Sequence, residues 1–184
     1  IGGEEVNAYS NSFGCLEHTG VDRPGEAKGL FFSTADLSGA STASLISASF
    51  GQTFRITPIQ LVRAVAAIVN GGYLLEPHVV STVLDADGNV VQKNESTVLR
   101  QVISEETSAT MRDFMEFVGT DGTASNAYTP GYRVGGKTGR SEKIDEYDEN
   151  GKPVDDKIVS FIGVAPINDP LYVVLVALAT PEYV

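Results

Sequence analysis

The sequence is poor in cysteine, tryptophan and positive charge. Its single cysteine, Cys15, cannot form an internal disulfide, and neither His18 nor His78 lies in a zinc-ligand spacing. The 13 Lys and Arg residues are outnumbered by 24 Asp and Glu residues, which gives a net charge of -11. A surface that binds nucleic acid or anionic lipid carries the opposite charge. We therefore expect no metal site and no nucleic-acid partner.

Long hydrophobic runs are also missing. The longest strongly apolar run, residues 171–179, has nine residues, whereas a membrane-spanning helix needs about 20. The chain is 42% hydrophobic and 20% charged over 184 residues. This composition and length predict one globular domain with a sizeable core and no membrane contact of its own.

Two segments carry clear helix signals. Residues 57–70 begin with a capping box that has proline at the first helical position, and they end at an Asn-Gly-Gly turn. Residues 104–118 carry an apolar stripe at the spacing i, i+3, i+4, i+7, which predicts a helix with one face in the core. The stripe consists of Met111, Phe114, Met115 and Val118. Weaker signals predict the tail of a helix at 1–12 and one short helix within 33–49.

Strand signals dominate the remainder of the chain. Residues 79–84 and 90–92 flank a turn-forming Asp-Ala-Asp-Gly-Asn sequence, which predicts a hairpin. Residues 132–138, 158–165 and 171–179 predict three successive strands. Helices followed by a run of strands indicate an α+β fold with a mostly antiparallel sheet at the C-terminal end. The last two strands are apolar on both faces, so helices should cover both. The chain has too few amphipathic helices for this, so either the sheet is partly exposed or covering elements lie outside these residues.

One octapeptide allows two interpretations. Residues 131–138 match the phosphate-loop pattern G-x-x-x-x-G-K-[ST]. In such a loop a helix follows the lysine, so that its N-terminus meets the phosphates. Residues 141–153 are instead polar and have no apolar stripe. We therefore predict that Lys137 lies on a strand, and a nucleotide-binding loop is the less favoured alternative.

On a strand, Lys137-Thr138-Gly139 has a different chemical meaning. This triplet matches K-T-G, the third of the sequence motifs of serine acyl-transferring penicillin-binding proteins and β-lactamases, after S-x-x-K and S-x-N. The lysine places positive charge beside a substrate carboxylate, and the threonine hydroxyl can donate a hydrogen bond to it. The glycine has no side chain, so a substrate backbone can lie against the strand.

Further stretches accompany this triplet in the order found in one family. The chain resembles the transpeptidase domain of class B, high-molecular-weight penicillin-binding proteins, and the sporulation and division branch is the most similar. The resemblance covers residue 19 to about residue 184. The matching stretches are Thr19–Glu26 (TGVDRPGE), Gly51-Gln52 with Thr57–Leu61 (TPIQL), Asn70–Gly72 with Pro77, and Gly135–Gly139 (GGKTG).

The resemblance implies an incomplete serine β-lactamase/transpeptidase-like fold, α+β, with an antiparallel C-terminal sheet packed with helices. Residues 1–184 are then the C-terminal part of a single transpeptidase domain, truncated at both ends. The nucleophile motif S-x-x-K and the motif S-x-N are absent from the chain. Because the nucleophile motif is absent, the chain alone is expected to be inactive. The resemblance also implies that the intact protein is extracytoplasmic and anchored to the cell membrane through a segment preceding residue 1.

The activity implied for the intact protein is D,D-transpeptidation, which crosslinks peptidoglycan stem peptides by serine acyl transfer without a cofactor. β-Lactams acylate the same serine. Lys137 is the expected catalytic residue of this chain, and Thr138, Gly139 and Arg140 are expected to bind substrate. An amide just beyond Gly139 would complete the oxyanion hole. Arg140 departs from the threonine usual in the family, and its direction, towards cleft or solvent, is open.

Several alternatives remain at this stage. A fragment of a β-lactamase or a β-lactam sensor belongs to the same superfamily, and a non-catalytic peptide-binding module belongs to a different class. The last strand, 171–179, is expected to lack a family neighbour that precedes residue 1. A bare apolar strand edge pairs readily with another chain, so self-association is a further expectation.

Overall fold

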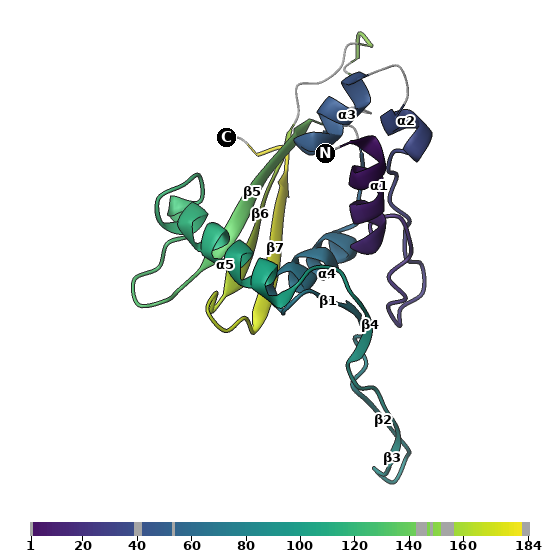
Figure 1. Cartoon of the computed structure of the whole chain (residues 1–184). Coiled ribbons are helices and arrows are strands. Elements are labelled where there is room, and N and C mark those ends of the chain that lie inside the picture. The colour runs from purple at the N-terminus through teal and green to yellow at the C-terminus, as the bar shows by residue number, and fades with distance from the viewer. Residues whose placement is uncertain are drawn as a thin grey trace. The chain divides into compact units, whose positions relative to one another are not determined.

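The computed structural model describes residues 2–38, 42–52, 54–142, 147, 149–151 and 157–181 (Figure 1). The chain divides into two compact units, residues 1–108 and residues 109–184. The boundary falls within the longest helix, α5 (Glu105–Thr120).

The helices of the first unit are α1 (Gly3–Ser12), α2 (Thr34–Ser38), α3 (Thr42–Ser49) and α4 (Pro58–Val69). The helix predicted at 1–12 is confirmed, and it ends where Gly14 adopts a positive φ of 74°. The prediction of one short helix within 33–49 is wrong, because two helices form there. The Ser- and Ala-rich segment has little hydrophobic periodicity from which their number could be read.

Helix α4 forms the core of the first unit, as its sequence predicts. The backbone N–H of Gln60 donates to the Thr57 hydroxyl at 3.3 Å, and the Thr57 N–H donates to the Gln60 side-chain oxygen at 2.8 Å. Pro58 occupies the first turn, where no N–H is needed. The buried residues of α4 include Ala64, Val65, Ala67 and Val69.

Four short strands follow α4 as two antiparallel pairs. Strand β1 (Tyr73–Glu76) pairs with β4 (Thr97–Gln101), and β2 (Thr82–Leu84) pairs with β3 (Val90–Lys93). The predicted hairpin is confirmed in β2 and β3. Strands β1 and β4 were not predicted, since each is short and neither alternates clearly between polar and apolar residues.

The second unit contains the C-terminal part of α5, the 3₁₀ turn η1 (Ser125–Ala127) and a sheet of β5 (Gly135–Glu142), β6 (Lys157–Ala165) and β7 (Tyr172–Ala179). The strand order is β5-β6-β7, and both pairings are antiparallel. The predicted α+β fold and antiparallel C-terminal sheet are confirmed. Strand β5 begins three residues after its predicted start, because its pairing with β6 begins at Gly135 and does not include residues 132–134.

Helix α5 packs closely on the sheet because two glycines remove side chains between them. A Cβ on Gly119 would lie 2.8 Å from the Val134 carbonyl oxygen, and one on Gly135 would lie 3.0 Å from the backbone carbonyl carbon of Met115 in α5. Met115 is buried in this unit, together with Ile162, Val164 and Ile167. The predicted core stripe is wrong for Phe114, which is 61% exposed, because the close contact turns Met115 towards the sheet instead.

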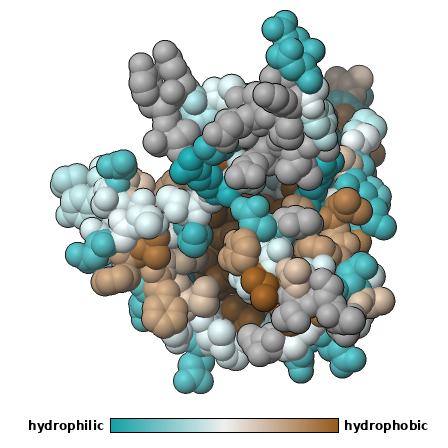
Figure 2. Space-filling view, turned by 90° about the horizontal axis from the view of Figure 1, so that it is seen from above, coloured by the Kyte–Doolittle hydropathy of each residue, from teal (hydrophilic) through white to brown (hydrophobic). Residues whose placement is uncertain are grey.

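Strand β7 presents alternate apolar side chains to solvent. Tyr172, Val174, Val176 and Leu178 are each at least half exposed. Helices therefore do not cover both faces of the last two strands in the part of the chain that the structure describes, and the sheet is partly exposed, which is one of the two alternatives that the sequence left open. Hydrophobic residues also reach the surface among hydrophilic ones on the face drawn in Figure 2.

Candidate active-site strand and supporting segments

The four residues predicted to act on substrate all lie on β5. Lys137 pairs with Ile162, Thr138 with Phe161, Gly139 with Ser160, and Arg140 with Val159. The strand continues through Glu142, so no helix begins after Lys137. The phosphate-loop alternative is therefore wrong, because its mechanism requires a helix N-terminus at that point.

Strand geometry separates the side chains of these residues. Successive side chains of a strand point to opposite faces, so Lys137 and Gly139 share one face while Thr138 and Arg140 share the other. Among the described residues β5 pairs only with β6, which leaves its second edge open. Lys137 is exposed, and its ammonium donates to the Thr138 carbonyl oxygen at 2.7 Å. Arg140 is also exposed.

Glycine at position 136 is required by packing within the sheet. A Cβ there would lie 2.4 Å from the Phe161 ring and 2.6 Å from the Ile162 carbonyl oxygen. A Cβ on Gly139 would meet only the Ser160 hydroxyl, at 2.7 Å. Packing within the sheet therefore requires glycine at position 136. At position 139 the missing side chain leaves the backbone accessible to the backbone of a ligand.

The hydroxyl of Thr123 contacts the threonine of the Lys-Thr-Gly signature, and the sequence analysis did not predict this contact. The Thr123 Oγ1 lies 3.1 Å from the Thr138 Oγ1, within hydrogen-bond distance. Thr123 lies between α5 and η1, 15 residues before Thr138. No spacing rule links a turn to a strand at that separation, so only the folded chain reveals the contact.

An ion pair joins α5 to the segment that leads into β5. Arg133 donates two hydrogen bonds to the Glu116 carboxylate, at 2.7 Å and 2.6 Å. These hydrogen bonds hold the pKa of Glu116 below its ordinary value, with burial opposing them. The fork-to-carboxylate geometry fixes both side chains, and it stabilises the approach to the signature strand.

In the first unit, the TGVDRPGE stretch forms a loop fastened by its own carboxylates. The Glu26 carboxylate accepts the N–H of Thr19 at 2.6 Å and that of Gly20 at 3.3 Å. Burial raises the pKa of Glu26, but these hydrogen bonds outweigh it and hold the pKa below its ordinary value. Asp22 accepts the N–H groups of Val79 and Val80, at 2.7 Å and 2.9 Å, which likewise lower its pKa.

The TPIQL stretch fastens the same region from α4. Gln60 is fully buried, and its side-chain amide donates to the carbonyl oxygens of Glu17 at 2.7 Å and Cys15 at 3.3 Å. Arg63 is buried beside it and donates to the carbonyl oxygens of Gly14 at 2.8 Å and Thr19 at 3.3 Å. These side chains hold the backbone of residues 14–19, which leads into the loop, so their contacts are structural.

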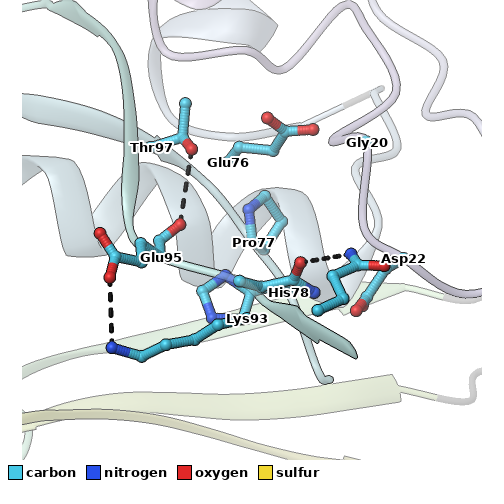
Figure 3. A pocket seen from close by; sticks show the side chains of 10 residues that line it. Gly20, Asp22, Glu76, Pro77, His78, Lys93, Glu95 and Thr97 are labelled. Atoms are coloured by element: carbon cyan, nitrogen blue, oxygen red, sulfur yellow. Dashed lines mark hydrogen bonds and ion pairs between the residues drawn. The ribbon is translucent and has the colours of Figure 1, made fainter. Parts of the chain in front are cut away.

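A polar cleft of about 310 Å³ opens where the loop meets the end of β1 (Figure 3). Its lining includes Asp22, Glu76 and His78, and it also includes Lys93 and Glu95, whose side chains form an ion pair at 3.2 Å. The residues predicted from the signature do not line this cleft. The cleft therefore marks where family stretches converge, and the chemistry predicted for Lys137 belongs to β5.

Among the described residues, His, Cys, Asp and Glu side chains do not form a group of three or more that could hold a metal ion. The helices of the described ranges are too short or too polar to cross a membrane.

The sheet and its signature strand define a class of protein: an α+β domain that carries the Lys-Thr-Gly element of serine acyl transferases. Comparison with known proteins gives the particular family. Residues 1–183 match the family described as penicillin binding protein transpeptidase domain. The chain belongs to this family.

Individual relatives agree with this assignment. The chain is 41% identical over 184 residues to stage V sporulation protein D of Bacillus subtilis, covering 99% of this chain and 27% of that protein. It is 34% identical over 146 residues to a peptidoglycan D,D-transpeptidase FtsI homolog of Mesostigma viride, covering 73% of this chain and 24% of that protein. The chain thus spans about a quarter of the length of these relatives.

Solved structures show the same fold. Penicillin binding protein 3 of Mycobacterium tuberculosis, complexed with aztreonam, superposes with a TM-score of 0.83 at 28% identity. The match covers 97% of this chain and 40% of that one. The predicted family and the predicted transpeptidase-like fold are both confirmed.

Proposed function

We propose that this chain is the C-terminal part of one transpeptidase domain, and that it supplies one wall of the substrate cleft of a peptidoglycan D,D-transpeptidase. The observation that carries the proposal is the position of Lys137-Thr138-Gly139 on an open edge of β5 in a chain of this family. An open strand edge accepts an extended peptide by strand addition. Stem peptides and β-lactams are the proposed ligands.

The reaction proposed for the intact protein is acyl transfer. A serine outside these 184 residues attacks the carbonyl carbon of a D-Ala-D-Ala stem peptide, and D-alanine leaves. The Lys137 side chain leaves β5 on the face opposite to the Thr138 side chain, but its ammonium folds back to the Thr138 carbonyl oxygen, and there it attracts the terminal carboxylate. The Thr138 hydroxyl donates a hydrogen bond to the same carboxylate. The Arg140 N–H lies just beyond Gly139 and stabilises the oxyanion. The amine of a second stem peptide then releases the acyl group as a crosslink.

The proposed setting is the extracytoplasmic side of the cell membrane, with the anchor in a segment N-terminal to this chain. Two structures of one relative support the proposed class of ligand: penicillin binding protein 3 of Mycobacterium tuberculosis has been crystallised as complexes with aztreonam and with ampicillin. The nucleophile motif is absent from these 184 residues. We therefore infer that the isolated chain forms no acyl-enzyme.

A fluorescent penicillin tests the proposal. It should label the full-length protein covalently, and it should leave the 184-residue chain unlabelled. Lys137→Ala should slow labelling on the order of 100-fold, because one fixed charge at the reacting centre is lost. The control Lys28→Ala changes an exposed lysine of the first unit and should label at the normal rate.

Three results would contradict the proposal. Label on the isolated chain would place a nucleophile within it. An unlabelled full-length protein would favour a non-catalytic peptide-binding module. Rapid release of hydrolysed penicillin would favour a β-lactamase, since a transpeptidase retains the acyl group.

A further inference from the structure

The contact between Thr123 and Thr138 gives a role to a residue outside the signature. Their hydroxyl oxygens lie 3.1 Å apart, and either can donate. A threonine hydroxyl has one proton and two lone pairs. If Thr138 donates its proton to a ligand carboxylate, as the proposed function requires, it can still accept one from Thr123.

The turn that carries Thr123 is fastened to the end of α5. Ala124 is buried, and its N–H donates to the Val118 carbonyl oxygen at 3.2 Å. The Ser125 N–H donates to the Gly122 carbonyl oxygen at 3.3 Å. A Cβ on Gly122 would lie 2.8 Å from the Val118 Cα. This turn therefore holds Thr123 at a fixed place relative to the helix.

Thr138 is held from two sides. The Lys137 ammonium binds its carbonyl oxygen at 2.7 Å, and the Thr123 hydroxyl binds its side chain. Its backbone is already fixed by pairing with Phe161, so its remaining freedom is rotation of the side chain about χ1 and of the hydroxyl. The Thr123 contact restricts both rotations.

We propose that Thr123 is a positioning residue that fixes the Thr138 side chain so that its hydroxyl donates to a ligand carboxylate. The proposal rests on the carboxylate-binding role assigned to Thr138 above. Thr123 itself does not touch the ligand; it donates to Thr138 and leaves the Thr138 proton directed outward. The hydroxyl of Thr123 is therefore the feature that matters, and its methyl group is not.

Penicillin acylation of the full-length protein tests this role. Thr123→Val keeps the shape and removes the hydroxyl, so acylation by benzylpenicillin should slow about five- to tenfold, the value of one neutral hydrogen bond. Thr123→Ser keeps the donor and should stay within about twofold of the wild-type rate. Thr129→Val is the matched control, because Thr129 is an exposed threonine six residues further along the chain whose hydroxyl, among the described residues, hydrogen-bonds only to the Ala127 carbonyl oxygen.

The methyl ester of benzylpenicillin separates positioning from folding. The ester has no carboxylate, so Thr123→Val should slow the acid and leave the much slower ester reaction unchanged. Equal slowing of both compounds, or no slowing of either, would overturn the role of Thr123. In a Thr138→Val background, Thr123→Val should have no further effect, and a further effect there would also overturn it.

The two proposals fail in different ways. If Thr138→Val leaves acylation unchanged, the carboxylate role of Thr138 fails and the role of Thr123 fails with it. If Thr138→Val is slow while Thr123→Val is normal, only the role of Thr123 fails. If the full-length protein is not acylated at all, the three-bond NMR couplings that report the Thr138 χ1 angle in the 184-residue chain decide. A single rotamer in wild type and averaged rotamers in Thr123→Val support the positioning role. Equal couplings in the two proteins refute it.

Discussion

Replacing Gln60 by alanine should destabilise the first unit far more than an ordinary surface substitution. Gln60 is 0% exposed. Its side chain accepts the Thr57 N–H at 2.8 Å and donates to the carbonyl oxygens of Glu17 and Cys15. Alanine removes all three hydrogen bonds at once, because its side chain has neither a donor nor an acceptor.

The magnitude follows from these partners. Loss of the reciprocal cap costs about 1 kcal/mol. Each partly buried carbonyl left without its donor costs about 1 kcal/mol, so the expected total is about 3 kcal/mol. A domain is stable by only about 5–15 kcal/mol. With a urea dependence of about 2 kcal/mol per molar, the midpoint should fall by about 1.5 M.

Urea unfolding followed by far-ultraviolet circular dichroism measures this change; the chain has no tryptophan but has seven tyrosines for a parallel fluorescence record. The matched control is Gln92→Ala, which removes an exposed side chain whose amide, within the described part of the chain, hydrogen-bonds only to Asn94. Amide hydrogen exchange at residues 14–20 should also accelerate in Gln60→Ala. Equal midpoints for the two variants would refute the fastening role of Gln60.

Three further predictions concern acid stability, packing and self-association. The folded pKa of Glu26 lies below its ordinary 4.5, so its stabilising contribution is complete above that pH and is lost as pH falls through the folded pKa. Glu26→Gln should therefore reduce the fall in melting temperature between pH 5 and pH 3, and an unchanged fall would contradict this. Gly136→Ala forces a Cβ to 2.4 Å from the Phe161 ring and should cost about 2 kcal/mol or more in urea unfolding; wild-type stability would show that the sheet yields easily. Val176→Lys on β7 should abolish concentration-dependent association in sedimentation velocity, whereas Val83→Lys on β2 should not; a monomeric wild-type chain at high concentration would exclude association through β7.

Local signals in the sequence were sufficient for some elements. Helix α4 is predictable because its cap, its proline and its terminal Asn-Gly-Gly all act within a few residues of one another. The strand position of Lys137 is predictable because the residues after it cannot form the helix that a phosphate loop needs. In both cases the decisive interactions are between sequence neighbours.

Other features depend on contacts that sequence neighbours do not determine. Strands β1 and β4 pair Tyr73 with Gln101, and neither segment has a strong pattern of its own. Phe114 lies in the apolar stripe of α5, yet the close contact at Gly119 and Gly135 leaves it exposed. The meeting of Thr123 with Thr138 likewise depends on how a turn is seated on a helix.

The fastening of the TGVDRPGE loop has a consequence for how such proteins are recognised. Glu26, Asp22, Gln60 and Arg63 bind backbone groups of their own unit, and none of them lies on β5. A descendant that had lost its reaction would still be selected to keep them, because they stabilise its fold. A match to these stretches therefore shows common ancestry. It does not distinguish an active enzyme from an inactive descendant.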